Sequence, residues 1–326
     1  MKRLIGAAAG SLFVLVAHAA SVVPESVIKD IDEGYGQRAL VKLRPLVQQF
    51  PKDREVQYRF GEALVIGNKL EEAQTAMKSA IEADPNASEL HRVLGEAYGS
   101  AAQQASFFSM VKLAKNSLTE FQTAVKLNPN DPDAHADLAA YYIQAPGVVG
   151  GSLDKAHEEE AALDKLAPVQ ALQTRASEAA QEKNWAAAEQ FLRQAIAIDK
   201  KSDSLLQLGM MQLHNDHANE ALVTFKTITA RVDAPASSWY YLARSVAVGH
   251  ASAADGIAAL RHYIDLPERP DMAPKLGWAH LRLGELYAIN NQKDLASTEI
   301  ELARKQTPAD DSNFKSALDK AVALVK

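Results

Sequence analysis

The chain has 326 residues, with 35 Lys and Arg against 41 Asp and Glu, and it contains no Cys. A mildly acidic chain lacks the clustered positive charge that binds phosphates, so we expect no nucleic-acid partner. The absence of Cys excludes disulfides and thiolate catalysis. Aromatic residues make up only 6% of the chain, which together with abundant Ala favours helices packed through small side chains.

The first twenty residues have the features of a secretory signal peptide. Lys2 and Arg3 precede an apolar run over residues 4–17, and small residues follow it. The run is shorter than the ~20 residues that a transmembrane helix needs. We therefore expect cleavage of residues 1–20, a mature chain without a stable membrane span, and a periplasmic location. The open alternative is an uncleaved membrane anchor.

A pattern of small residues recurs along the rest of the chain with a period of 34 residues. Gly61 and Gly95 are 34 residues apart, as are Pro51 and Pro85. This period is typical of a repeated helix–turn–helix unit. We expect ten small residues to let neighbouring helices approach closely: Gly61, Ala73, Gly95, Ala139, Ala156, Ala188, Gly209, Ala221, Gly284 and Ala296.

These marks resemble the tetratricopeptide-repeat family. The clearest unit reads Leu283-Gly284, Tyr287, Ala296, Ile300, Ala303 and Pro308. The resemblance implies an all-α fold, an α-α superhelix or solenoid of about eight helix–turn–helix units. We expect N-terminal repeats over residues 21–168 with two enlarged units, C-terminal repeats over 169–308, and a cap helix over 309–326.

Two enlarged units interrupt the period. Pro85 and Pro129 are 44 residues apart, and Pro129 and Pro168 are 39 apart. The extra residues fall near 100–110 and in a turn at 145–151, and this combination resembles a subgroup of exported bacterial tetratricopeptide proteins. Either the insertions lengthen two helices that pack on each other, or they form a contact surface. A proline-rich segment, 266–274, is expected to be a loop.

In the tetratricopeptide family the first helices of the units line a concave groove. The resemblance implies that certain first-helix positions face a protein or peptide partner, acidic in the early units and more apolar later. The candidate partner-binding residues are Tyr58, Arg92, Leu206, Met210, Leu213, Tyr240, Arg244, Trp278, Leu281 and Glu285. The alternative is that Trp278 and Leu206 simply pack between neighbouring helices.

No catalytic motif is present in the sequence. His214 and His217 are the best metal candidates, but they lack a third ligand, and residues 157–160 are expected to form an exposed helical face. We therefore expect no catalysis, no cofactor and no metal. The sequence favours an exported protein-binding scaffold that captures a partner in its concave groove. The alternative is a structural or assembly subunit of a cell-envelope complex that uses its convex face and insertions.

Overall fold

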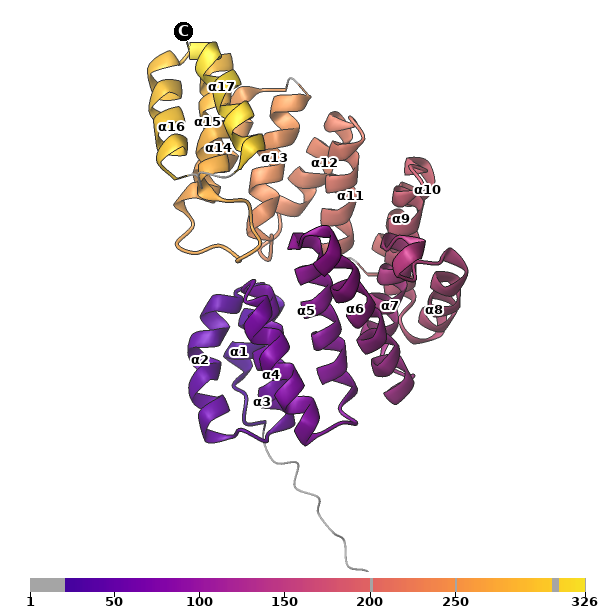
Figure 1. The fold of residues 1–326 in the computed structure, drawn as a ribbon. Helices are drawn as coiled ribbons and strands as arrows, with labels where there is room; N and C mark the ends of the chain where they lie inside the picture. The colour runs from indigo at the N-terminus through magenta and orange to yellow at the C-terminus, as the bar shows by residue number, and fades with distance from the viewer. Residues whose placement is uncertain (1–20, 200–201, 250, 307–310, 326) are drawn as a thin grey trace, which may run out of the picture.

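The computed structural model describes residues 21–199, 202–249, 251–306 and 311–325, so the expected signal peptide lies outside the described residues. Within these ranges the chain forms seventeen α-helices and one 3-10 helix, with no β-strand (Figure 1). Sixteen α-helices follow one another as eight antiparallel pairs, and a final helix covers the last pair. The expected all-α solenoid of about eight units with a cap helix is confirmed.

Each unit consists of a first helix and a second helix. The first helices are α1 (Glu25–Asp32), α3 (Arg54–Ile66), α5 (Ser88–Gln104), α7 (Pro132–Gln144), α9 (Pro168–Gln181), α11 (Ser202–His214), α13 (Ala236–Val248) and α15 (Leu276–Ile289). The second helices are α2 (Gly36–Gln49), α4 (Leu70–Ala83), α6 (Phe107–Leu127), α8 (Leu153–Leu166), α10 (Trp185–Ile198), α12 (Ala218–Thr229), α14 (Ala253–Asp265) and α16 (Lys293–Lys305). The cap helix is α17 (Ser312–Val325).

In four of the units the two helices touch at a glycine. A Cβ atom on Gly95 would lie 2.7 Å from Cδ1 of Phe121, and one on Gly209 would lie 2.7 Å from Cζ of Phe225. Gly61 and Gly284 meet Met77 and Ile300 in the same way. All ten small residues expected to allow close packing are buried. A side chain at these glycines would therefore force the two helices apart.

The turns inside the units also repeat. Asn68, Lys183, Asp216 and Asn291 each have a positive φ angle and each lies between the two helices of its unit. Asn and Asp tolerate this left-handed conformation better than most residues, because their short polar side chains can hydrogen-bond locally. The same tight turn therefore closes four of the eight units.

The insertion near residues 100–110 lengthens both helices of the third unit. Helix α5 has 17 residues and α6 has 21, whereas α3 has 13. The second insertion forms a 3-10 helix, Gly147–Val149, and buries Val149 against α6. The Tyr141 hydroxyl lies 2.9 Å from the carbonyl oxygens of Ala114 and Val149, which fixes the turn to α6. The insertions therefore pack on each other.

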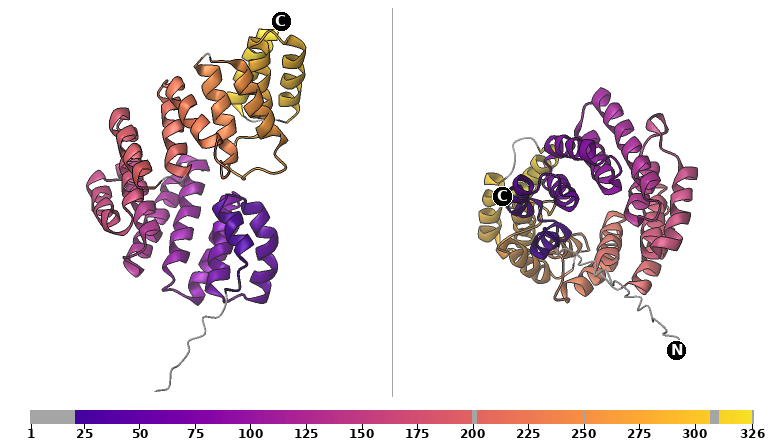
Figure 2. Two further views of the ribbon diagram at one scale, coloured as in Figure 1. Left: turned by 180° about the vertical axis from the view of Figure 1, so that it is seen from behind. Right: turned by 90° about the horizontal axis from the view of Figure 1, so that it is seen from below.

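The proline-rich loop between α14 and α15 contacts the first unit of the solenoid. The Asp271 carboxylate accepts a hydrogen bond from the Gln37 backbone N–H at 2.7 Å, and the Asp271 N–H donates to the Gly34 carbonyl at 3.0 Å. Arg38 forms an ion pair of 2.6 Å with Glu268. Segments more than 200 residues apart therefore join, and Figure 2 shows the helices arranged around a central axis.

The cap helix closes the apolar end of the last unit. Phe314 and Ala321 of α17 are buried against Leu281, Ile300 and Ala303. Repeat solenoids need such an element, because the last unit would otherwise expose the face that a further repeat would cover. Within the described ranges, no helix is both long enough and apolar enough to cross a membrane.

Three first helices carry a His paired with a Glu of the second helix of the same unit. His91 lies 2.7 Å from Glu120, and His280 lies 2.6 Å from Glu299. The other ring nitrogen of His91 lies 3.1 Å from the Pro85 carbonyl oxygen. Both partners of His91 only accept hydrogen bonds, so the imidazolium form satisfies both contacts. The hydrogen bond to Glu120 raises the pKa of His91 above its usual value.

Replacing Gly95 by Leu should lower the free energy of unfolding by about 1–3 kcal/mol, because the new side chain enters the space of Phe121. The measurement is the denaturant midpoint followed by circular dichroism. Gly147→Leu is the matched control, since a Cβ atom there meets nothing within 4 Å. Equal midpoints for wild type and Gly95→Leu would contradict the assigned helix contact.

The His91–Glu120 pair should make stability depend on pH. Because the pKa of His91 is higher in the folded state, its contribution is complete below its ordinary value of 6.5 and is lost as the pH rises through the folded value. The stability difference between wild type and His91→Gln should therefore be full below pH 6.5 and shrink as the pH rises above it. Denaturation below and above this pH measures it, with the exposed His217→Gln as control. A constant difference would argue against the charged pair.

Candidate partner-binding groove

The first helices of the units form the inner wall of the solenoid. Neighbouring first helices contact each other directly at α1–α3, α3–α5, α5–α7, α7–α9, α11–α13 and α13–α15. Elements that meet their equivalents in the next unit lie on the shorter, inner side of a curved array. The concave surface, the part of a solenoid that presents an extended binding face, is therefore built from these helices.

A polar cluster occupies this inner wall in the N-terminal half. The buried Arg92 side chain on α5 donates hydrogen bonds to the Tyr58 hydroxyl at 2.8 Å, to Glu62 at 3.2 Å and to Asp137 at 3.2 Å. It also forms an ion pair with Glu96. One guanidinium thus connects α3, α5 and α7. We call these five residues the Arg92 cluster.

The acidic groups of the Arg92 cluster are half-buried. Burial and the neighbouring Asp137 carboxylate raise the pKa of Glu96, and burial also raises the pKa of Asp137. Both shifts have the same main physical cause, because a charged carboxylate loses its hydration when it is covered by protein. One guanidinium therefore faces three carboxylates, and the pKa values of two of these are raised.

A cavity of about 630 Å³ opens on the inner wall farther along the chain. Its apolar and aromatic lining consists of Ala180, Trp185, Met210, Met211, Leu213 and Tyr241, and its polar lining of Gln144, Ser177, Gln181, His214 and Arg244. We call it the central cavity. It receives side chains from α7, α9, α11 and α13, which are four consecutive first helices, and from the start of α10.

Met210 and Arg244 are among the side chains of the central cavity that a partner can reach. Met210 is 42% exposed. Arg244 is half-buried, and within the described part of the chain no acidic side chain forms an ion pair with its guanidinium. An arginine without an internal acidic partner can bind a carboxylate in bidentate geometry. The central cavity therefore combines an apolar surface with one available positive charge.

The structure brings together only part of the candidate groove residues. Met210, Leu213 and Arg244 meet in the central cavity, and Tyr58 and Arg92 meet in the polar cluster. Leu213 contributes to the cavity wall but is itself nearly buried. All of these residues lie on the inner wall, because equivalent positions of successive first helices face the same side of a solenoid.

Other candidate residues serve packing instead. Tyr240 and Leu281 are buried in the core, so neither side chain is accessible to a partner. Trp278 packs edge to face on Phe314, with ring centroids 5.0 Å apart, because the cap helix covers it.

Two further candidates also have internal partners. Leu206 packs on the large C-terminal core, as the alternative for this residue proposed. Glu285 pairs with Arg282 at 2.7 Å. Both side chains therefore already have contacts within the protein, although their positions in the repeat predicted contact with a partner.

Several residues of the central cavity were missed in the sequence. Trp185 begins a second helix, so no rule about first-helix positions selects it. Met211 follows the predicted Met210, and both line the cavity. Tyr241 follows the predicted Tyr240 and lines the cavity instead of it. The Trp185 ring lies 5.5 Å from that of His214, which places this histidine in an aromatic contact. The Met210-Met211 pair is the one signal that could have identified the site.

Comparison with known proteins supports the repeat assignment. Residues 30–97 match the family model described as tetratricopeptide repeat. No curated protein sequence matches the chain. Yeast Tom70 has a similar fold, with a TM-score of 0.63 and 14% identity over 93% of this chain and 61% of that chain. Human IFIT1, solved as a dimer with m7Gppp-AAAA, gives 0.59 and 15% over 88% and 68%.

A bacterial repeat protein is also similar. TTC0263, a thermophilic tetratricopeptide protein of Thermus thermophilus, gives a TM-score of 0.52 with 18% identity over 58% of this chain and 96% of that chain. At these identities the solved structures establish the fold alone. Residues 30–97 therefore match a tetratricopeptide repeat, and the paired helices and glycine contacts continue the same fold along the rest of the described chain.

Proposed function

We propose that this chain is an exported scaffold that captures a protein or peptide partner in the central cavity of its concave groove. The tetratricopeptide fold is a protein-interaction scaffold and is generally non-catalytic. The observation that carries the proposal is the pairing of the exposed Met210 with the available Arg244 on one concave surface. Met and Arg are both enriched at protein interfaces.

The lining suggests the chemistry of the partner. Trp185, Met210 and Tyr241 offer apolar and aromatic surface, which suits an apolar side chain. Arg244 suits a carboxylate beside it. The partner is therefore a segment with an apolar residue next to an acidic one. IFIT1 was solved with m7Gppp-AAAA, but the acidic balance of this chain favours a protein partner.

Export to the periplasm is part of the proposal and rests on the sequence of residues 1–20, where a positive start precedes a short apolar run. The scaffold would then meet its partner in the cell envelope.

A second function is favoured by an exposed apolar tip on the enlarged unit. Phe107 is 68% exposed and Phe108 is 88% exposed at the start of α6, and Val148 of the neighbouring 3-10 helix is also exposed. Apolar side chains gathered on a surface mark interaction sites. This tip would suit an assembly subunit that docks into an envelope complex through its insertions.

The cavity proposal predicts that Met210→Ala/Arg244→Ala removes most partner binding while the fold is retained. The measurement is photo-crosslinking in the cell envelope. A photoreactive residue replaces Gln181 of the cavity lining, both in the otherwise wild-type chain and in the double variant. Met272→Ala/Arg304→Ala is the matched control, because both residues are exposed outside the cavity. Unchanged adducts in the cavity variant would contradict the proposal. Loss only in Phe107→Ala/Phe108→Ala would support the assembly function.

The Arg92 cluster should behave as a structural element. Arg92→Met leaves Glu96 and Asp137 without their cation and Glu62 with Arg59 alone, so the free energy of unfolding should fall by up to about 3 kcal/mol at neutral pH. Denaturant unfolding measures this loss. Arg54→Met is the control, because its side chain is half exposed and its ion pair with Glu89 should contribute less than about 1 kcal/mol. A stable Arg92→Met variant would show that the cluster does not hold the three helices together.

A further inference from the structure

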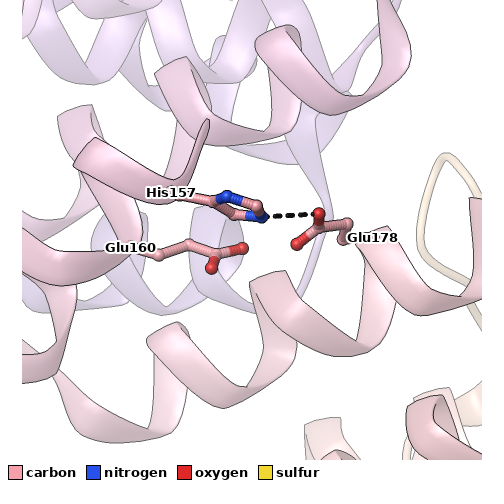
Figure 3. Close-up of side chains that lie close together, drawn as sticks. All are labelled: His157, Glu160 and Glu178. Atoms are coloured by element: carbon pink, nitrogen blue, oxygen red, sulfur yellow. Dashed lines mark hydrogen bonds and ion pairs between the residues drawn. The ribbon is translucent and has the colours of Figure 1, made fainter. Parts of the chain in front are cut away.

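Helices α8 and α9 bring one imidazole and two carboxylates together outside the central cavity. His157 and Glu160 are three residues apart on α8 and so project from the same side of the helix. Glu178 comes from α9, and its Oε1 lies 2.8 Å from Nε2 of His157. One candidate ligand atom from each residue lies within 4.8 Å of the others, and Figure 3 shows the side chains turned toward one another.

Burial of Glu160 distinguishes this cluster from an ordinary surface group. Residues 157–160 were expected to form an exposed face, but Glu160 is only 4% exposed, because α9 packs over it. Its Oε1 atom has no hydrogen-bond partner within the described part of the chain. A buried carboxylate oxygen without a partner is costly, so a bound cation or a proton is the expected explanation.

The charges around the cluster leave room for a cation. Arg175 is the nearby positive side chain, and it forms two hydrogen bonds with Asp164, of 2.7 and 2.8 Å. Its remaining contact with Glu160 is a longer one, 3.4 Å, to the other carboxylate oxygen. Arg175 thus serves two carboxylates, Glu160 and Asp164, and Glu178 pairs with His157. The cluster therefore has fewer positive groups than carboxylates.

We propose that His157, Glu160 and Glu178 bind a divalent transition-metal ion, and that Zn²⁺ matches this ligand set best. Zinc accepts nitrogen and carboxylate oxygen ligands, and its sites with three protein ligands keep a fourth position for water. His157 is 56% exposed at its side chain, so the ion has a path from solvent. Magnesium and calcium prefer six or more oxygen ligands, which this cluster does not offer.

One of the three ligand spans already matches that of a zinc site, and a modest shift of side chains would bring the third ligand in. Ligand atoms on a tetrahedral zinc ion lie about 3.3 Å apart, so the 2.8 Å contact between His157 and Glu178 already has nearly the required span. Burial and the nearby Glu178 charge raise the pKa of Glu160 to about 7, and a bound cation would stabilise its charged form.

Among the described residues, the other His–Glu pairs are not part of a three-ligand cluster. At His91 and His135 both ring nitrogens are already engaged, one with a Glu and the other with a proline carbonyl. At His157 a ring nitrogen faces Glu178 with the second carboxylate beside it. The site therefore joins the second helix of the fourth unit to the first helix of the fifth, next to Ser177 of the central cavity wall.

The test is calorimetric titration of ZnCl₂ into the full chain after treatment with a chelator. Wild type should bind one Zn²⁺, and His157→Gln and Glu178→Gln should each bind at least about tenfold more weakly. The matched control is His217→Gln. His217 and Glu220 have the same three-residue spacing, but both are exposed and the pair is not part of a three-ligand cluster among the described residues. Its affinity should equal that of wild type.

A second variant separates the metal from a shared proton. Glu160→Gln keeps the shape of the side chain and can hydrogen-bond to Glu178, so the fold should be retained by circular dichroism. If the site binds metal, this variant loses zinc affinity, and the visible absorption of tetrahedral Co²⁺ seen with wild type disappears. Absence of saturable zinc binding in wild type, or equal binding by wild type and Glu160→Gln, would overturn the proposal.

Discussion

The contact between a glycine on the first helix and a large side chain on the second helix sets the geometry of four of the eight units. Where Gly61, Gly95, Gly209 and Gly284 lie, the second helix can approach until Met77, Phe121, Phe225 and Ile300 touch the backbone of the first helix. This short distance fixes how each unit packs on the next. Each unit is rotated slightly relative to the one before it. The curvature of the solenoid, and with it the concave face, is the sum of these rotations.

The curvature brings the two ends of the array together. The loop before α15 reaches the first unit, where Asp271 binds backbone groups at Gly34 and Gln37 and Glu268 pairs with Arg38. These contacts span the opening between distant units. They therefore limit how far the solenoid can open, which matters for a cavity whose wall comes from four consecutive first helices.

Two clusters of charged side chains lie between the helices of this structure, and they differ in how their carboxylates are paired. In the Arg92 cluster three carboxylates share one internal cation, which connects three first helices. The α8–α9 cluster leaves a buried oxygen of Glu160 without a partner among the described residues. In a chain without cysteine, such polar contacts between units supplement the apolar core that holds the repeats together.

The sequence by itself determined the repeat, the number of units and the close-packing glycines, because these depend on residues at fixed spacing within one unit. It also identified the inner-wall positions, of which Met210 and Arg244 reach the central cavity. Only the tertiary structure decided that Leu281 and Tyr240 are buried, that the cap helix covers Trp278, and that α9 buries Glu160. Exposure depends on which unit packs over a residue, and repeat spacing carries no information about contacts between elements that lie far apart in the chain.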